Sequence, residues 1–175
     1  MSGPVILAPV HRSNLDSPLL APLTRRRFRA LAKESLFKVR PMAWFLAALG
    51  AFPVRRGSAD RESIRAARSL LDAGAMLLVF PEGGRQTGDQ IEDLFDGTAY
   101  LAAKTGAVVV PVGISGTETS MPMGTRIPRP TRVRVAVGRP IQPPDQSGPR
   151  SALSEWTTVL TAGLQEAQDA AVSMR

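Results

Sequence analysis

Cysteine is absent from this chain of 175 residues, and histidine occurs once, as His11. Without cysteine the chain has no disulfide, no thiolate nucleophile and no zinc–thiolate site. With one histidine, a catalytic metal would depend on carboxylates, so we expect no metal site and disfavour metal-assisted hydrolysis. The lone histidine is therefore the one side chain suited to act as a base near neutral pH.

Long apolar runs are also absent. The longest uncharged stretch near the middle runs from Met42 to Val54 and includes Pro53, whereas a membrane-spanning helix needs roughly 18–20 apolar residues. We therefore expect no spanning helix and interpret this stretch as a buried or interfacial helix. Residues 1–10 also lack the basic n-region of a signal peptide. The length fits one domain, which we expect to comprise residues 1–175.

Lysine and aromatic residues are scarce, whereas arginine is abundant. Lysine supplies three of the 22 basic residues, the net charge is +7, and aromatic residues make up 5% of the chain. A basic chain suits phosphorylated substrates, anionic lipid surfaces or nucleic acid, although genome composition is an equally good explanation of the arginines. Nucleic-acid binding would need stacking aromatics or a recognition helix, and neither pattern is present, so we expect no nucleic-acid partner.

Short apolar runs alternate with amphipathic segments along the chain. The pattern predicts strands at residues 5–8, 51–54, 76–80, 107–112 and 132–137, and helices at 16–23, 42–49, 60–74 and 95–105 and from residue 151 onward. Alternation of this kind predicts an α/β fold, a single domain whose mostly parallel or mixed central sheet has helices on both faces. Ligands of such sheets gather at the carboxyl ends of the strands.

His11 lies in the loop that leaves the first predicted strand, five residues before Asp16. A carboxylate at that spacing can accept the Nδ1 proton and leave Nε2 free as a base. Asp16 or Ser17 also fits the N-cap of the following helix, with Pro18 at its first position. Ser13 does not fit a hydrolase nucleophile, because the chain lacks the Gly-x-Ser-x-Gly elbow and its histidine comes first in the order.

A second polar cluster follows the strand predicted at residues 76–80. Glu82 stands there beside Gly83, and both Arg56 and Arg85 follow strands that end at the same edge of the sheet. Since guanidinium groups bind phosphate through paired hydrogen bonds, a phosphate-bearing ligand is expected. Solvated surface charges and a simple turn are the plainer interpretations of the same residues.

Four blocks occur in a fixed order: the His-x4-Asp pair, residues 50–56 (GAFPVRR), residues 80–85 (FPEGGR) and residues 110–112 (VPV). Together they closely resemble the sequence blocks of the glycerolipid acyltransferases, the 1-acylglycerol-3-phosphate (lysophosphatidate) acyltransferase family. The resemblance covers roughly residues 4–138. Gly84 and Gln86 depart from the threonine and serine that the third block of the family commonly carries.

The resemblance implies a role for each block. His11 would be the catalytic base and Asp16 its partner. The acceptor site would contain Arg56, Glu82, Gly83 and Arg85, with the arginines on the phosphate. Pro111 would belong to the block linked with the acyl-donor pocket.

The implied reaction moves a fatty acyl group from acyl-CoA or an acyl carrier protein to the hydroxyl of lysophosphatidate, giving phosphatidate. The thioester is a co-substrate, and no cofactor is implied. Glycerol 3-phosphate, another lysophospholipid or a glycolipid intermediate are alternative acceptors, because the blocks are shared among enzymes that use them.

Family members usually carry a longer, often membrane-associating segment before the histidine motif, which here begins ten residues into the chain. We therefore expect peripheral binding to an anionic membrane, on the cytoplasmic face of the cell membrane. The sequence offers a basic cluster for this contact beside the uncharged stretch Met42–Phe52. The cluster comprises Arg25, Arg26, Arg27 and Arg29.

Overall fold

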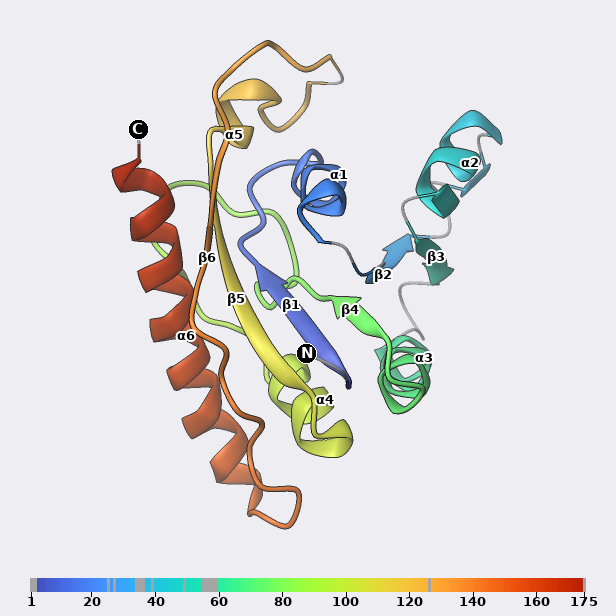
Figure 1. Cartoon of the computed structure of the whole chain (residues 1–175), viewed down its shortest axis with the longest axis vertical. Helices are drawn as coiled ribbons and strands as arrows, with labels where there is room; N and C mark the ends of the chain where they lie inside the picture. Colours follow the sequence, from blue (N-terminus) through green and yellow to red (C-terminus); the bar gives the residue numbers. More distant parts are fainter. Residues whose placement is uncertain are drawn as a thin grey trace.

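A computed structural model describes residues 3–24, 26, 28–33, 37–38, 40–48, 50–54, 60–125 and 127–174. Within these residues one six-stranded sheet forms the centre of the molecule, in the order β3-β2-β4-β1-β5-β6 (Figure 1). The strands are β1 (Val5–Pro9), β2 (Phe28–Lys33), β3 (Ala51–Val54), β4 (Met76–Leu78), β5 (Val108–Ser115) and β6 (Arg134–Val137). The pairs among β1 to β5 are parallel, and β6 runs antiparallel to β5.

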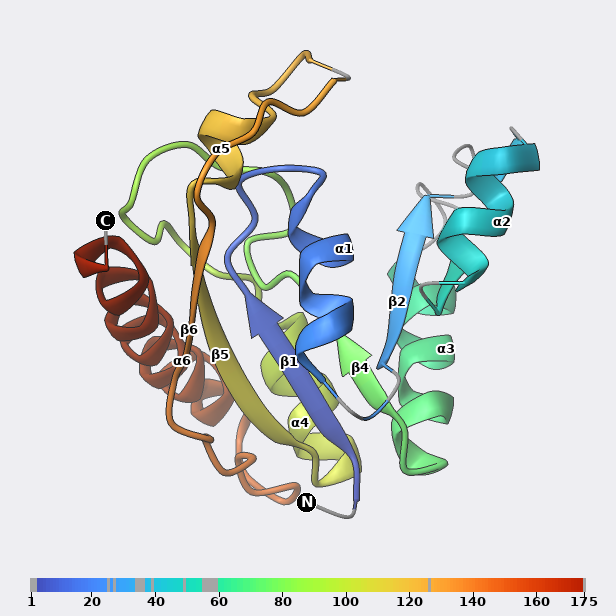
Figure 2. The ribbon, with the colours of Figure 1, turned by 45° about the horizontal axis from the view of Figure 1, so that its top comes forward.

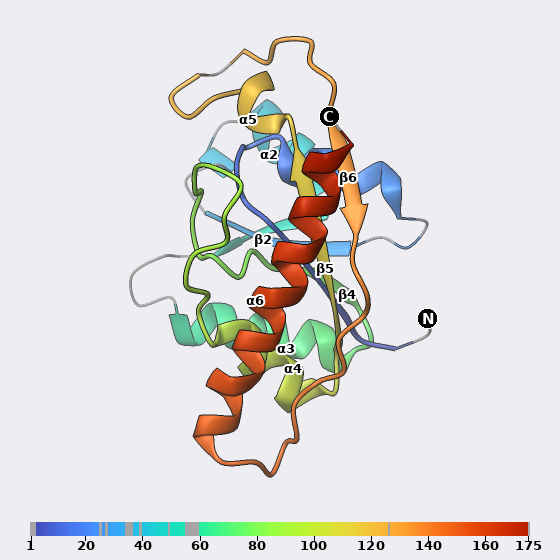
Figure 3. The same cartoon turned by 90° about the vertical axis from the view of Figure 1, so that its left-hand side faces the viewer.

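The helices cover the two faces of the sheet unequally. Their bounds are α1 (Asp16–Leu20), α2 (Arg40–Ala48), α3 (Asp60–Asp72), α4 (Gly97–Thr105), α5 (Thr117–Ser120) and α6 (Arg150–Ser173), with a 3₁₀ turn at Ala21–Leu23. One core cluster joins α3, α4 and α6 to the sheet face that carries Ile6 and Val109. The opposite face, with Leu7 and Val110, is covered by Leu20 of α1. Figure 3 shows α6 crossing the first face, where it packs against α4, which in turn packs against α3.

The close approach of α6 to β5 depends on a residue without a side chain. A Cβ at Gly113 would lie 2.1 Å from the carbonyl oxygen of Ala167, so no larger residue fits there.

The turn just before α6 contains Asp145, whose carboxylate accepts hydrogen bonds from the backbone N–H and from the hydroxyl of Ser147. Both bonds lower the pKa of Asp145, and the bond from the backbone N–H has the larger effect.

The predicted fold class is confirmed, and the predicted segments overlap five of the strands and the long helices. The strand β2 was not expected, because Phe28–Lys33 mixes alanine with basic residues and has no β-branched residue. The expectation that Asp16 or Ser17 caps the next helix is wrong, because the N-cap is Leu15. Asp16 is the first helical residue and its carboxylate makes no capping bond.

The parallel strands bring β1, β4 and β5 to a common edge at their carboxyl ends. The loop after β1 carries His11, the loop after β4 carries Glu82, and α5 follows β5. In Figure 2 these loops and α1 lie together at the end of the sheet toward which β1 and β4 point.

Arg26 occupies the opposite edge of the sheet. Its guanidinium donates hydrogen bonds to the carbonyl oxygens of Gly3 and Gly74, which precede β1 and β4. Arg26 is therefore a structural clamp, and the expectation that it belongs to a lipid-facing basic cluster is wrong. Arg29 is exposed, whereas Arg25 and Arg27 lie outside the described residues.

In the described part of the chain, no helix has both the length and the apolar character needed to cross a bilayer. The helix α2 follows β2 at the outer end of the sheet (Figure 1). Its Trp44 is 75% exposed.

Candidate active site

His11 is oriented by a buried carboxylate. Its Nδ1 lies 3.0 Å from Oδ2 of Asp16, whose side chain is fully buried. The same Oδ2 accepts the backbone N–H groups of Arg12 and Ser13, each at 2.7 Å. This explains why Asp16 does not cap α1: its carboxylate folds back onto the preceding loop. An acceptor at Nδ1 favours the tautomer that leaves Nε2 with a free lone pair.

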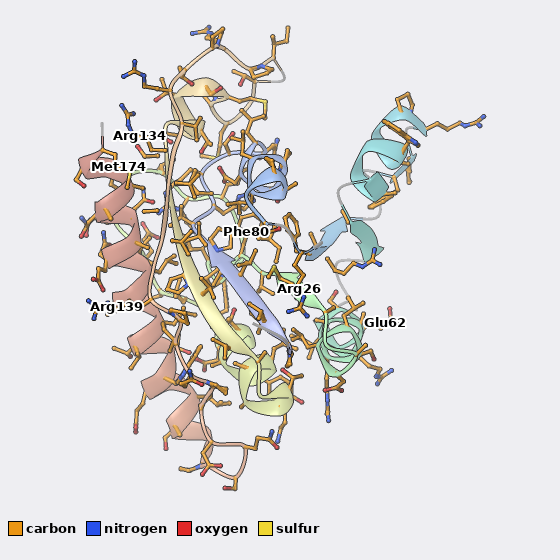
Figure 4. All side chains as sticks on the ribbon, viewed as in Figure 1. Arg26, Glu62, Phe80, Arg134, Arg139 and Met174 are labelled. Carbon is orange, nitrogen blue, oxygen red and sulfur yellow. The ribbon has the colours of Figure 1, made fainter. Side chains whose placement is uncertain are left out.

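The ring of His11 is also fixed from one side by an aromatic partner. It stacks on Phe80, with ring centroids 3.9 Å apart and an angle of 22° between the planes. Figure 4 marks Phe80 near the tip of β1. The His11 side chain keeps 19% of its surface exposed, and no described residue makes a hydrogen bond to Nε2. No described residue therefore competes with a reacting hydroxyl for this nitrogen.

A buried ion pair joins the two sequence blocks. Nη1 of Arg12 donates to both carboxylate oxygens of Glu82, at 2.7 and 2.9 Å, and both side chains are 1% exposed. The second oxygen of Glu82 also accepts the backbone N–H of His11 at 2.7 Å. Glu82 thus contacts the protein with both oxygens, so any effect of Glu82 on an acceptor is indirect.

Further hydrogen bonds tie the loop after β4 to the histidine loop. The carbonyl oxygens of Gly88 and Gln90 accept from Nε and Nη2 of Arg12, at 2.7 and 3.2 Å. The carbonyl oxygen of His11 accepts the N–H of Gln86 at 2.8 Å. Both backbone polar groups of His11 are therefore hydrogen-bonded, the N–H to Glu82 and the carbonyl oxygen to Gln86.

Gly83 and Arg85 lie on the same loop as Glu82. Gly83 has a φ of 68°, and a Cβ there would lie 2.6 Å from the ring of Phe95, so the turn requires glycine. Arg85 is half-buried and immediately precedes Gln86, whose N–H contacts His11. Its guanidinium makes no hydrogen bond or ion pair with the residues that the structure describes, so it is free to bind a ligand.

The remaining predicted site residues do not join this cluster in the described structure. Pro111 is buried within β5, paired with Ala8, and its ring lies 3.5 Å from the Cβ position of Gly163 in α6. Pro111 therefore packs between sheet and helix, and a link with the acyl donor would be indirect. Arg56 lies outside the described residues.

Sequence reasoning missed two residues of this cluster. Arg12 was not singled out from the sequence, although a charged residue in a strand-end loop could have been matched with Glu82 in the loop after the adjacent parallel strand. Ser13, rejected as a nucleophile, donates its hydroxyl to the carbonyl oxygen of Met121 at 3.0 Å. That bond connects the histidine loop with the segment after α5, and no sequence signal indicates it.

A single histidine, held by a buried aspartate at the carboxyl edge of a parallel sheet, defines an acid–base site that can activate a hydroxyl. The described residues contain no group of three or more histidine, aspartate or glutamate side chains placed to hold a metal ion.

The Acyltransferase family model matches residues 1–115. This chain belongs to the Acyltransferase family. Its fold resembles the crystal structure of the 1-acyl-sn-glycerophosphate (LPA) acyltransferase PlsC from Thermotoga maritima, with a TM-score of 0.75 and 27% identity, over 95% of this chain and 67% of that chain.

Curated relatives are similar over most of the chain. The chloroplastic 1-acyl-sn-glycerol-3-phosphate acyltransferase of Arabidopsis thaliana is 30% identical over 79% of this chain and 39% of its own length. The 1-acyl-sn-glycerol-3-phosphate acyltransferase of Streptococcus pneumoniae is 31% identical over 78% and 49%. The lyso-ornithine lipid O-acyltransferase of Pseudomonas aeruginosa is 31% identical over 68% and 46%. The chain thus spans less than half the length of these three relatives.

Proposed function

We propose that this protein transfers a fatty acyl group from a thioester, acyl-CoA or an acyl carrier protein, to the free hydroxyl of lysophosphatidate and forms phosphatidate. The observation that carries the proposal is the His11–Asp16 pair with Nε2 unengaged by the described residues. The names of the Arabidopsis thaliana and Streptococcus pneumoniae relatives support this acceptor.

In the proposed step, Nε2 of His11 removes the proton of the acceptor hydroxyl as its oxygen attacks the thioester carbonyl. The tetrahedral intermediate then expels the thiolate, which takes the proton back from His11 and leaves as a thiol. Asp16 stabilises the imidazolium between these two events. No acyl group is attached to the protein, and the thioester needs no cofactor. A positioned base of this kind typically accelerates a reaction by about 10²–10⁴-fold.

Arg85 is the proposed contact for the acceptor phosphate, with Arg56 as a second arginine from the neighbouring block. The support for Arg85 is its half-buried place beside the His11 backbone and the absence of a partner among the described side chains. A guanidinium in this setting can donate two parallel hydrogen bonds to a phosphate and hold the hydroxyl near His11. Glu82 and Gly83 shape the loop that presents Arg85.

A second acceptor class has specific support, because one relative is named a lyso-ornithine lipid O-acyltransferase. Glycerol 3-phosphate and other lysophospholipids are further candidates on the chemistry of the site. These acceptors share a free hydroxyl and differ in whether they carry a phosphate. The acceptor phosphate is therefore the feature to test.

An acceptor with a fatty chain resides in a bilayer, so we propose an anionic membrane surface as a partner and a peripheral place on the cytoplasmic face of the cell membrane. The exposed Trp44 of α2 and the exposed Arg29 support this proposal. Because attraction of basic residues to anionic lipid is screened by salt, binding to vesicles should weaken as the salt concentration rises.

The test is release of free thiol from acyl-CoA, and from acyl carrier protein in parallel, with each acceptor supplied in turn. Lysophosphatidate, glycerol 3-phosphate, lyso-ornithine lipid and a monoacylglycerol without phosphate form the panel. Rapid turnover with lysophosphatidate and little with monoacylglycerol supports the proposal. Faster turnover with lyso-ornithine lipid would move the assignment to that acceptor, and no turnover with any would reject acyl transfer by this chain.

A further inference from the structure

The segment after α5 forms a closed loop at the active-site edge of the sheet. At its base, the N–H of Arg129 donates to the carbonyl oxygen of Ser120 at 2.8 Å, and the hydroxyl of Ser120 donates to the carbonyl oxygen of Arg129 at 2.7 Å. Residues 121–132, here called the 121–132 loop, project beyond the sheet at the end where α5 lies (Figure 3).

The base of this loop is attached to the catalytic loop. Met121 is 8% exposed, and its carbonyl oxygen accepts the hydroxyl of Ser13, two residues after His11. Thr125 donates its N–H to the carbonyl oxygen of Pro122 and forms a turn within the loop. Three prolines, at positions 122, 128 and 130, further restrict the backbone. The loop is therefore anchored beside His11.

The projecting part of the loop exposes two apolar side chains. Ile127 is 80% exposed and Met123 is 48% exposed. Exposed apolar side chains beside basic ones are the pattern of elements that lie in a bilayer interface.

The charge of the same region has one sign. Residues 119–132 contain three arginines and neither aspartate nor glutamate. Arg129 and Arg132 are exposed, and their guanidinium groups make no hydrogen bond or ion pair with the residues that the structure describes. Such groups are available for phosphate oxygens at an anionic surface.

We propose that the 121–132 loop docks on an anionic lipid surface, with Ile127 and Met123 in the interface and Arg129 and Arg132 at the headgroups. The bond from Ser13 to Met121 then holds His11 close to the plane in which a lipid acceptor lies. The proposal rests on the proposed lipid acceptor for its purpose. An acidic protein partner, such as an acyl carrier protein, would fit the arginines but leaves the exposed Ile127 without a reason.

Because this chain contains no cysteine, one substitution creates a unique labelling site. Ile127→Cys carries an environment-sensitive fluorophore, and Val159→Cys, at an exposed apolar position on α6, is the matched control (54% exposed). Vesicles of phosphatidylcholine with phosphatidylglycerol are added to the full chain without substrate. We expect a blue shift and a several-fold rise in emission at position 127 only, and a much smaller change with pure phosphatidylcholine.

The charge is tested by Arg129→Gln with Arg132→Gln. Two basic residues contribute about 1 kcal/mol each at an anionic surface, which corresponds to about thirty-fold weaker vesicle binding. The control is Arg65→Gln with Arg139→Gln, which removes the same charge from α3 and from the far end of β6. Figure 4 marks Arg139 near the middle of α6, away from the 121–132 loop.

The proposal is overturned by a lack of vesicle binding, by binding with an unchanged signal at position 127, or by equal responses at positions 127 and 159. A response at position 127 to acyl carrier protein and not to vesicles assigns the loop to that partner and also overturns it. The fluorescence assay does not depend on acyl transfer. If the chain shows no turnover in the thiol-release assay but the probe at position 127 still responds to vesicles, the proposed function is rejected and the docking inference stands.

Discussion

Around His11, most polar groups of the protein are hydrogen-bonded to one another, and the exceptions among the described residues are Nε2 of His11 and the buried Oδ1 of Asp16. The 121–132 loop is joined to the histidine loop by the hydrogen bond from Ser13 to Met121. It presents an isoleucine and two arginines without partners in the described structure. We call the group of His11, Arg12, Asp16 and Glu82 the His11 corner. Its charges are buried and hydrogen-bonded, so that its geometry is set before any ligand arrives.

The two regions lie at one edge of the sheet but are suited to different tasks, namely chemistry at His11 and contact with a membrane surface. Chemistry that depends on a hydrogen bond of about 3 Å requires side chains that do not move, and burial with several partners supplies that. Contact with a fluid surface requires the reverse, namely exposed groups whose partners are supplied from outside. The predictions below test whether the two regions are as different as their contacts indicate.

The largest effect is expected at His11. His11→Ala should lower turnover at least about a hundred-fold, since a general base contributes about 10²–10⁴-fold and no other histidine is present. The free energy of unfolding should change little. Thiol release and urea unfolding are the measurements, and Asn14→Ala, an exposed residue of the same loop, is the control. Turnover above about a hundredth of wild type would show that His11 is not the base.

Asp16→Asn should cause the second-largest loss of turnover, close to that of His11→Ala. The amide is similar in size but carries no charge to face the imidazolium, and its NH₂ group disfavours the Nδ1-protonated ring. We expect turnover to fall to within about ten-fold of the His11→Ala value, because the base then has the wrong tautomer. The same thiol-release assay measures it. A variant that raises only the KM of the acceptor would place Asp16 in acceptor binding instead.

Glu82→Gln tests whether burial makes the ion pair essential. Removing one partner of a buried pair leaves an uncompensated charge and costs about 3–5 kcal/mol of the free energy of unfolding. The control is Arg68→Gln, which breaks the half-exposed pair of Arg68 with Asp72 (N···O distance 3.5 Å) and should cost less than about 1 kcal/mol. Urea unfolding of both variants gives the comparison, and equal losses would contradict the distinction between the two pairs.

Arg85→Ala should weaken binding of the phosphorylated acceptor. Loss of a charged hydrogen bond is worth about 1.5–3 kcal/mol, or about 10- to 150-fold in the KM of a phosphorylated acceptor. The KM of acyl-CoA should stay nearly constant, and Arg65→Ala on α3 should change neither. Steady-state kinetics with both substrates varied is the measurement. Equal damage to both KM values would make Arg85 a structural residue.

The fold class could be predicted from the sequence, because short-range periodicity defines strands. The placement of His11 and Glu82 at one edge of the sheet could also be predicted, because the carboxyl ends of parallel strands lie at the same edge. Sequence reasoning missed β2, whose alanines and basic residues carry no strand signal, and it misplaced Arg26. Whether an arginine faces lipid or clamps two carbonyl groups depends on contacts between Arg26, Gly3 and Gly74, residues far apart in the chain. The same holds for the pair of Arg12 with Glu82, since only the folded register makes them neighbours.

The smallest effect on stability is expected at the tip of the 121–132 loop. Ile127→Ser should change the free energy of unfolding by less than about 0.5 kcal/mol, as surface substitutions without buried contacts usually do. If the loop serves only the membrane contact, turnover with a lysophosphatidate below its micellar concentration should also be unchanged, whereas turnover with vesicle-borne acceptor should fall. Leu164→Ser, at a fully buried position of α6, should destabilise the fold and lower both activities together. Equal activity of Ile127→Ser in both assays would show that the exposed isoleucine has no part in substrate access, and the contrast between the two regions would then be one of burial alone.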